Sequence, residues 1–347
     1  MFEAVIALCV ALAGGPCRDH LLPGYEAQDP ASCEAALIAK PPDLSAEAPL
    51  VVKGAARCQQ AGDALSFSEV ADGVFVHVGA IEEPDKSNRG DTSNLGFVIG
   101  ESSVAVIDTG TARWMGEAVW RAIRQRTNLP VSHVILTHVH PDHVLGTAAF
   151  STTDAQVIGH ANLSRALADR ASNYIESLDR LIGTADFLGT RAVAVDTVVE
   201  NDMMVDLGGR TLRLQAWPTA HTGTDITIFD VATGTLFAGD LVFDRHTPAL
   251  DGSLRGWRAV MAELQAFKLN LIVPGHGGPT LRWPEGAAAM TRYLGVLEAD
   301  TREAIDTGMR LGAAVETIAQ SEADRWQLFD AYNPRNATVA FTELEWE

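Results

Sequence analysis

The chain has 347 residues, of which 47% are hydrophobic and 20% are charged, a composition typical of a compact globular protein. Its 45 acidic and 26 basic residues give a net charge of −19. Nucleic-acid binding depends on basic clusters that neutralise phosphates, and no such cluster is visible in the sequence. The composition therefore argues against a nucleic-acid partner and against polyanionic substrates.

The first residues include an apolar run, Ala4–Ala13, which is too short to span a bilayer as a helix. The run ends in Ala-Leu-Ala, a small-residue pattern that favours a signal peptide over residues 1–13 and a periplasmic or secreted protein. Glu3 and the absence of Lys or Arg before the run are atypical of a leader. A buried first strand or helix, and a cytoplasmic location, therefore remain as alternatives.

All four cysteines lie in this N-terminal part of the chain. Cys9 would leave with the leader, and the clustering of Cys17, Cys33 and Cys58 favours a local disulfide in an exported protein, with Cys17–Cys33 as the simplest pair. Free thiols in a reducing compartment are the alternative. Residues 14–65 are otherwise expected to be irregular, with one short helix near Ser32–Lys40 that two following prolines end.

Residues 66–347 are expected to form one domain in which strands alternate with helices. Apolar and alternating runs predict strands at Val74–Val78, Leu95–Ile99, Ser103–Ile107, Val131–Leu136, Gln156–Ile158, Ala192–Val199, Thr211–Gln215, Ile226–Phe229, Thr235–Ala238 and Leu271–Val273. Helical periodicity predicts Trp114–Arg126, Leu163–Ile182 and Trp257–Phe267, with further helices to about Gln327. Two runs of strands, each followed by helices, predict an α/β protein of two mixed β-sheets packed face to face and flanked by helices, an αββα sandwich.

Three histidines and an aspartate follow one of the apolar strands directly. Alternate side chains of an extended segment share a face, so His138 and His140 can bind the same metal ion. Pro141 bends the chain and brings Asp142 and His143 to a second position beside the first. Neutral imidazole and carboxylate ligands suit Zn²⁺, with Fe and Mn as competitors. Such a density of ligands after a strand indicates metal binding rather than packing.

Three further residues, His221, Asp240 and His276, each follow an expected strand closely. Taken alone, His221 would as readily be a surface residue and Asp240 a turn residue. His276 lies between glycines that allow a close approach of the backbone. Loops at one end of a sheet gather functional groups on a rigid scaffold, so together the three residues are expected to complete two coordination shells.

The ordered set of all seven residues resembles the metallo-β-lactamase superfamily over the chain from Val70 to about Pro279. The resemblance implies two zinc ions per chain. One would be held by His138, His140 and His221, and the other by Asp142, His143 and His276, with Asp240 bridging the two.

Short motifs at both ends of the chain are similar to a narrower branch, the quinoprotein relay system zinc metallohydrolases, or SoxH-like proteins. These motifs are Cys-Arg-Asp-His-Leu at residues 17–21, Trp-Gln-Leu-Phe-Asp at 326–330 and Phe-Thr-Glu-Leu-Glu-Trp at 341–346. This likeness implies an exported protein with a functional link to a PQQ-dependent dehydrogenase system.

The expected chemistry is metal-dependent hydrolysis. Two metal ions about 3.5–4 Å apart activate a water molecule and polarise the scissile carbonyl or phosphoryl oxygen. Asp240 would hold the metal ions together, while Asp142 would orient the nucleophile or pass a proton to the leaving group. Asp108 is expected to support a ligand imidazole, with a turn or capping carboxylate as the alternative. His246 and Trp257 are expected to line the substrate pocket.

The residue types at this site also bear on the small-molecule substrate. β-Lactamases with several histidines usually lack a carboxylate at the position of Asp240, which argues against that activity. Phe243 stands where quorum-signal lactonases carry Tyr, and the acidic C-terminal part does not match the basic glutathione site of glyoxalase II. A small ester, thioester or lactone is the expected substrate. Two other classes remain open: an oxidoreductase with one iron, like the sulfur dioxygenases of the superfamily, and a non-catalytic accessory protein of a quinoprotein dehydrogenase.

Overall fold

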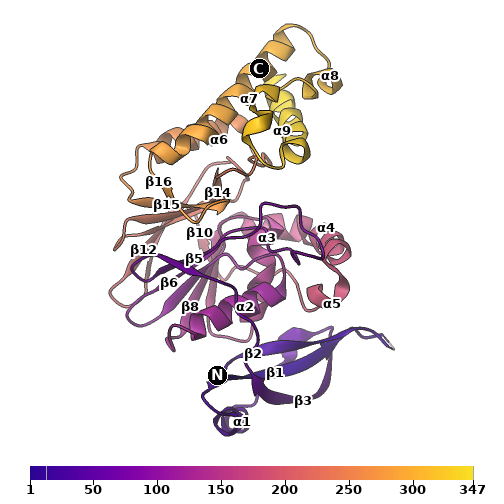
Figure 1. Ribbon diagram of the computed structural model, residues 1–347, viewed down its shortest axis with the longest axis vertical. Helices are drawn as coiled ribbons and strands as arrows, with labels where there is room; N and C mark the ends of the chain where they lie inside the picture. The colour runs from indigo at the N-terminus through magenta and orange to yellow at the C-terminus, as the bar shows by residue number, and fades with distance from the viewer. Residues whose placement is uncertain (13, 347) are drawn as a thin grey trace.

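The computed structural model describes residues 1–12 and 14–346 of the chain, and its main strands form three sheets. Figure 1 shows the smallest sheet at the N-terminal end, two larger sheets in the middle, and the C-terminal helices at the opposite end. Within the described residues, no helix is both long and apolar enough to cross a membrane.

The N-terminal residues fold into a sheet of three antiparallel strands in the order β2-β1-β3. Its elements are β1 (Phe2–Cys9), β2 (Cys17–Ala27), α1 (Pro30–Ala39), η1 (Ser45–Glu47) and β3 (Val51–Gln60). The prediction of an irregular segment at 14–65 is therefore wrong. The two outer strands mix apolar residues with charged residues, glycine and proline, and they gain their structure by pairing with β1, a long-range contact that local sequence patterns do not report.

The apolar run expected as a leader contributes residues 4–9 to β1, the central strand of this sheet. This is the buried first strand that the sequence left open as the alternative. Residue 13, at the expected cleavage position, lies outside the described residues.

The cysteines pair as Cys9–Cys17 and Cys33–Cys58, so the expected Cys17–Cys33 bond is wrong. Cys9 and Cys17 face each other across the β1–β2 register, with their Cα atoms 4.0 Å apart. Cys33 is the buried residue of α1, and it is bonded to Cys58 of β3. The strand register, which the sequence did not reveal, thus decides the pairing.

The remaining strands form two mixed sheets. The first has the order β10-β9-β8-β7-β6-β5-β4, antiparallel from β4 to β7 and parallel from β7 to β10. Its strands are β4 (Ser68–Ala71), β5 (Val74–His77), β6 (Leu95–Ile99), β7 (Val104–Ile107), β8 (Val131–Ile135), β9 (Gln156–His160) and β10 (Thr197–Val199). The second has the order β11-β12-β13-β14-β15-β16, in which only the β14–β15 pair is parallel. Its strands are β11 (Asp202–Asp206), β12 (Thr211–Ala216), β13 (Ile226–Asp230), β14 (Thr235–Phe243), β15 (Leu271–His276) and β16 (Leu281–Arg282).

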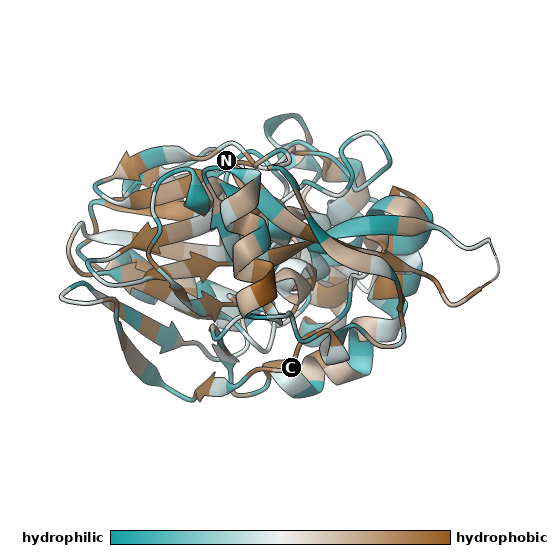
Figure 2. Cartoon of the chain, turned by 90° about the horizontal axis from the view of Figure 1, so that it is seen from below, coloured by the Kyte–Doolittle hydropathy of each residue, from teal (hydrophilic) through white to brown (hydrophobic). Residues whose placement is uncertain are grey.

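Helices flank the two sheets or connect their strands. They are α2 (Arg113–Arg124), α3 (Pro141–Val144), α4 (Leu163–Ile182), α5 (Thr184–Phe187), α6 (Leu254–Gln265), α7 (Ala288–Asp306), α8 (Leu311–Val315) and α9 (Phe329–Leu344), with short 3₁₀ turns η2 (Leu145–Phe150), η3 (Glu285–Ala287) and η4 (Gln320–Arg325). One apolar core joins α2 and α4 to the first sheet, and another joins α6, α7 and α9 to the second. A third core of Val, Ile and Leu residues lies between the sheets. Brown apolar residues accordingly recur along the strands in Figure 2. The predicted αββα sandwich is confirmed.

The N-terminal sheet is joined to the core by buried ion pairs with α2. Arg113 contacts Glu47, and its Nε lies 3.2 Å from a carboxylate oxygen of Glu117. Glu117 also contacts Arg18 and lies 3.3 Å from Nδ1 of His20. Burial raises the pKa of Glu117, but the charge of Arg18 and the neighbouring His20 and Arg113 outweigh burial and hold it well below its ordinary range.

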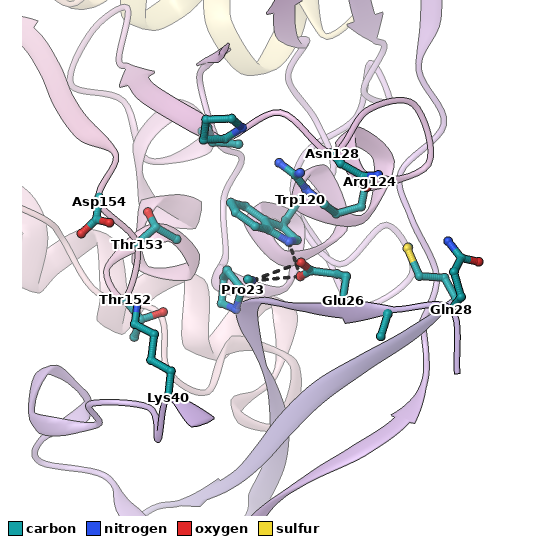
Figure 3. A pocket seen from close by; sticks show the side chains of 15 residues that line it. Pro23, Glu26, Gln28, Lys40, Trp120, Arg124, Asn128, Thr152, Thr153 and Asp154 are labelled. Carbon is teal, nitrogen blue, oxygen red and sulfur yellow. Dashed lines mark hydrogen bonds between the residues drawn. The ribbon is translucent and has the colours of Figure 1, made fainter. Parts of the chain in front are cut away.

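A cavity of about 550 Å³ lies at the same junction (Figure 3). On one wall, Nε1 of Trp120 donates a hydrogen bond of 2.6 Å to the carboxylate of Glu26. Arg124 lies over the Trp120 ring, with Cζ 4.6 Å from the ring centroid. None of the residues that line this cavity belongs to the His and Asp cluster described below.

Candidate metal centre

The structure brings the seven His and Asp residues of the sequence motif together at one edge of the two sheets. The segment after β8 carries His138 and His140, and the short helix α3 that Pro141 begins carries Asp142 and His143. His221 lies in the turn between β12 and β13. Asp240 lies within β14, which continues to Phe243, and His276 is the last residue of β15. The two strands run parallel, so they present both side chains at the same end.

Four of these residues form a first ligand group: His138, His140, His221 and Asp240. Nε2 of His138 lies 3.6 Å from Oδ2 of Asp240, and Nε2 of His221 lies 3.4 Å from the same oxygen. Nδ1 of His140 is 2.9 Å from Nε2 of His221. The ligand atoms therefore surround one small volume.

The second ligand group contains Asp142, His143 and His276. Nε2 of His276 lies 3.4 Å from Oδ2 of Asp142 and equally far from Oδ2 of Asp240. Nε2 of His143 lies 3.7 Å from Oδ2 of Asp142 and 3.2 Å from Oδ1 of Asp240. Asp240 therefore faces both groups, the position that a bridging ligand requires.

Three of the facing atoms are buried and lack a hydrogen-bond partner: Nε2 of His138, Nε2 of His143 and Oδ1 of Asp240. Unpaired buried polar atoms are costly and rare in folded proteins. Here they converge on one place, and their types are nitrogen and carboxylate donors of the kind that bind Zn²⁺. The residues present thus fit a bound metal.

Burial lowers the pKa of His138 well below its ordinary value, and the neighbouring His143 lowers it further. Burial also lowers the pKa of His221 to about 3. For Asp240, burial raises the pKa, but the surrounding histidines, with His276 the strongest, hold it well below the usual range. A neutral His138 and His221 beside an ionised Asp240 are in the protonation states that metal binding requires. For His143 and His276 burial lowers the pKa, but the neighbouring carboxylates, with Asp240 the strongest, outweigh burial and raise it.

Asp108, which is not a member of either ligand group, hydrogen-bonds to the imidazole of His143. Its Oδ2 accepts hydrogen bonds of 2.8 Å from Nδ1 of His143 and from Oγ1 of Thr137, and its Oδ1 accepts another from the Thr137 backbone N–H. Asp108 has a φ of 57°, in the left-handed region that Asp tolerates better than most residues. The bond to Nδ1 leaves Nε2 of His143 free to face the ligand group.

Three other candidate ligand histidines also have polar partners outside the two ligand groups. Nδ1 of His276 donates to the Thr92 carbonyl at 2.8 Å, and Nδ1 of His221 donates to the Ala249 carbonyl at 2.5 Å. Nε2 of His140 lies 3.3 Å from Oδ2 of Asp251. None of these partners was predicted from the sequence. Two of the three partners are backbone carbonyls. Because every residue type has one, the sequence does not indicate which carbonyl will accept the bond.

Asp251 is itself fixed by Arg170 of α4, whose Nη1 contacts the same oxygen, Oδ2. Burial raises the pKa of Asp251, but hydrogen bonds from His140 and Arg170 outweigh burial and hold the pKa well below its ordinary value. The carboxylate therefore stays ionised beside the His140 ring.

A glycine is required behind the bridging carboxylate. A Cβ atom at Gly275 would lie 1.9 Å from Oδ1 of Asp240, closer than any two such atoms can approach. The backbone of β15 can pass this close to the carboxylate only because residue 275 has no side chain.

A cleft of about 400 Å³ opens onto Asp142, Asp240, His140 and His276. Its other walls come from the segment between β5 and β6, from α4 and from α9, and include Pro84, Tyr174, Ser177, Leu178, Leu181, Tyr332 and Arg335. His246 lines the cleft, as the sequence predicts. Its ring lies 4.8 Å from the His276 ring and 4.7 Å from that of Tyr332, and burial, together with His276, lowers its pKa to about 4.

Trp257 does not line the cleft, so that prediction is wrong. The side chain is fully buried, and its Nε1 donates to the Leu241 carbonyl at 3.0 Å. Its ring lies 5.2 Å from the His221 ring, so it packs behind this histidine. The reason is that α6 turns its apolar face towards β14, and Trp257 belongs to that face.

Comparisons with known proteins agree with this geometry. The profile of the Metallo-beta-lactamase superfamily matches residues 88–276, more than half of the chain. A metallo-beta-lactamase from Pontibacter korlensis superposes with a TM-score of 0.54 at 20% identity over 67% of this chain and 99% of that one. The stereoselective inverting sec-alkylsulfatase Pisa1 from Pseudomonas sp. superposes with a TM-score of 0.62 at 14% identity, over 81% of this chain and 50% of that one. The DIM-1 metallo-beta-lactamase gives a TM-score of 0.52 at 14% identity, over 67% and 97%. At these identities the likeness to the solved structures concerns the fold.

Proposed function

Because the chain belongs to the metallo-beta-lactamase superfamily, we propose that it is a hydrolase with two zinc ions that acts on a small ester, thioester or lactone. The observation that supports the proposal most is the position of Asp240, which lies 3.4 Å from ligand nitrogens of both groups, His221 in one and His276 in the other. One shared carboxylate between two sets of histidines is the arrangement expected of a two-metal site.

The bound metal ions would supply Lewis-acid polarisation of the substrate oxygen and would lower the pKa of a water molecule. Asp142 is the acidic residue of the centre that is partly open to the cleft, with 20% of its side chain exposed. Its Oδ2 can orient the attacking water and then pass a proton to the leaving group. His246 and Tyr332 close one side of the cleft with rings packed edge to face, which limits the access of bulk water to the reacting atoms.

The cleft favours a small substrate with an apolar part. Leu178, Leu181 and Pro84 line one part of it, and about 400 Å³ accommodates a small molecule. Arg335 is the only Lys or Arg among the described residues that line the cleft, and its Cζ lies 5.7 Å from the centroid of the Tyr332 ring. The apolar lining and the single cationic side chain are the basis for proposing a neutral or weakly charged substrate.

We also propose that the protein belongs to the SoxH-like branch, with export to the periplasm and a link to a quinoprotein dehydrogenase system. The support for this is the three end motifs and the N-terminal disulfides. Two disulfides in one small sheet are suited to an oxidising compartment.

The proposal is tested by elemental analysis of the protein purified without added metal, together with hydrolysis assays on ester, thioester and lactone panels. We expect about two zinc ions per chain, and loss of both metal and turnover in Asp240→Ala. Asp202→Ala, an exposed carboxylate on β11, is the matched control and should keep both. One iron per chain that is unchanged in Asp240→Ala would contradict the proposal and favour thiol oxidation. Two zinc ions without turnover on any panel would favour the accessory role.

A further inference from the structure

The loop between β14 and α6, residues 244–253, makes polar contacts with the imidazole rings of two candidate ligands. We call it the support loop. Its Ala249 carbonyl accepts the 2.5 Å hydrogen bond from Nδ1 of His221, and its Asp251 carboxylate lies 3.3 Å from Nε2 of His140. Both histidines belong to the first ligand group. The support loop therefore fixes the orientation of two of the three imidazole rings in the first ligand group.

One side chain of the C-terminal helix α9 holds the support loop on both sides of Ala249. Oδ1 of Asn336 accepts a hydrogen bond of 2.9 Å from the Leu250 N–H, and its Nδ2 donates one of 2.6 Å to the Pro248 carbonyl. Asn336 is 1% exposed, so water does not compete for these bonds. The Ala249 carbonyl is thus fixed by a residue that is 87 positions further along the chain.

Two more contacts tie the support loop to the C-terminal part. The Glu343 carboxylate accepts hydrogen bonds of 2.6 Å from Oγ of Ser253 and 2.7 Å from the Leu254 N–H, where α6 begins. The Thr247 N–H donates to the Gln327 carbonyl at 3.0 Å. These three anchors, Gln327, Asn336 and Glu343, lie beyond residue 276, outside the part of the chain that the superfamily profile matches, whereas Arg170 of α4, which contacts Asp251, lies inside it.

We propose that α9, through Asn336 and the support loop, is a positioning element of the metal centre. It orients His221, and together with Arg170 it orients His140, and thereby sets the affinity of the first metal position. The second position depends on it less, because there the loop reaches only His276, through the Asp244 N–H to the His276 carbonyl and through the His246 ring. The inference rests on the two metal positions of the proposed function. The second group is held elsewhere, with His143 bonded to Asp108 and His276 bonded to Thr92.

Asn333 provides a matched control for Asn336. Both lie on α9, both are buried, and both hydrogen-bond to the hydroxyl of Tyr293. The second bond of Asn333 goes to the Ile318 carbonyl, at 2.9 Å, and not to the support loop. Substitution of each by Asp keeps the size of the side chain and replaces an N–H donor by an oxygen. Asn336→Asp and Asn333→Asp should therefore cost similar stability but differ at the metal centre.

The test measures the affinity of each of the two metal equivalents by competition with a chelator. We expect Asn336→Asp to lose about 10-fold or more in one equivalent, as is typical when an outer partner of a ligand is removed, and to keep the other. Asn333→Asp should keep both. Equal affinities in the two variants, or an equal loss in both equivalents, would overturn the proposal. If Asn336→Asp does not fold, Glu343→Ala, which changes a partly exposed side chain, decides in its place by the same criterion.

A second measurement separates this proposal from the proposed function. Nitrogen NMR of the histidine rings in metal-free protein reports their tautomers directly. We expect the His140 and His221 signals to change in Asn336→Asp and not in Asn333→Asp. Signals that are unchanged in both variants would overturn the proposal even if two metal ions bind. A wild type that binds fewer than two metal ions would instead contradict the proposed function, while the NMR comparison would still decide on the support loop.

Discussion

Replacement of Arg113 by Met tests whether the buried ion pairs fasten the N-terminal sheet to the core. The Arg113 side chain is 1% exposed and contacts Glu47 of the N-terminal part and Glu117 of its own helix. Met keeps much of the apolar stem and removes the charge. Glu47, with 2% of its side chain exposed, would then remain buried without a partner, because one of its oxygens already lacks one.

The expected cost follows from the general behaviour of buried pairs. Removal of one partner of a buried ion pair destabilises a protein by about 3–5 kcal/mol. Unfolding entropy of roughly 2.1 cal/mol/K per residue, over the 347 residues, converts about 4 kcal/mol into a fall of roughly 5 °C in the midpoint of thermal unfolding. Differential scanning calorimetry and urea denaturation measure both quantities.

The exposed pair Arg57–Asp19 supplies the control, since its side chains are 50% and 39% exposed. Arg57→Met should change stability by less than about 1 kcal/mol. In a double variant, Glu47→Gln should recover part of the loss caused by Arg113→Met, because no unpaired charge is left at that position. Equal effects of Arg113→Met and Arg57→Met, or no recovery in the double variant, would refute the reasoning.

Gly275→Ala would place a Cβ 1.9 Å from Oδ1 of Asp240 and should abolish the binding of at least one metal ion, as measured by elemental analysis; full metal content would count against the bridging position. Asp108→Asn should weaken metal binding by about 10–100-fold in chelator competition, and an unchanged affinity would show that this carboxylate has no supporting role. For His77, burial lowers the pKa, but the hydrogen bond to Asp91 outweighs it, so the net shift is upward from 6.5. The His77–Asp91 pair therefore contributes its full stabilisation below pH 6.5, and this contribution is lost as pH rises through the raised pKa. As pH rises from below 6.5 to above the raised pKa, the urea midpoint should fall more in wild type than in His77→Gln.

The sandwich could be predicted because its strands and helices carry their own periodicity. Leu163–Ile182 was expected as a helix and forms α4 with the same bounds, since apolar residues recur at helical spacing and Gly183, at a φ of 103°, ends it. The order of strands could not be derived from such patterns.

The candidate ligands could be singled out because chemistry limits the residue types, and the structure brings all seven together. The residues that contact the ligand imidazoles from outside the two groups could not be singled out in this way, except for Asp108. Thr92 and Ala249 act through carbonyls, which every residue has, and Asp251 has no motif around it. Trp257 was misplaced because closeness in sequence to the loop says nothing about which way a helix faces. The N-terminal sheet was missed because its pairing is long-range.

The path of the chain through the candidate centre has a consequence for its biosynthesis. The ligands are spread from residue 138 to residue 276, and the Ala249 carbonyl that turns His221 is held by Asn336, close to the last residue, 347. A chain emerging from the ribosome can pair the strands of both sheets before this helix exists. The hydrogen bonds that orient His221 form only after residue 336 has been synthesised, so the first ligand group reaches its final geometry later than the strands that carry it.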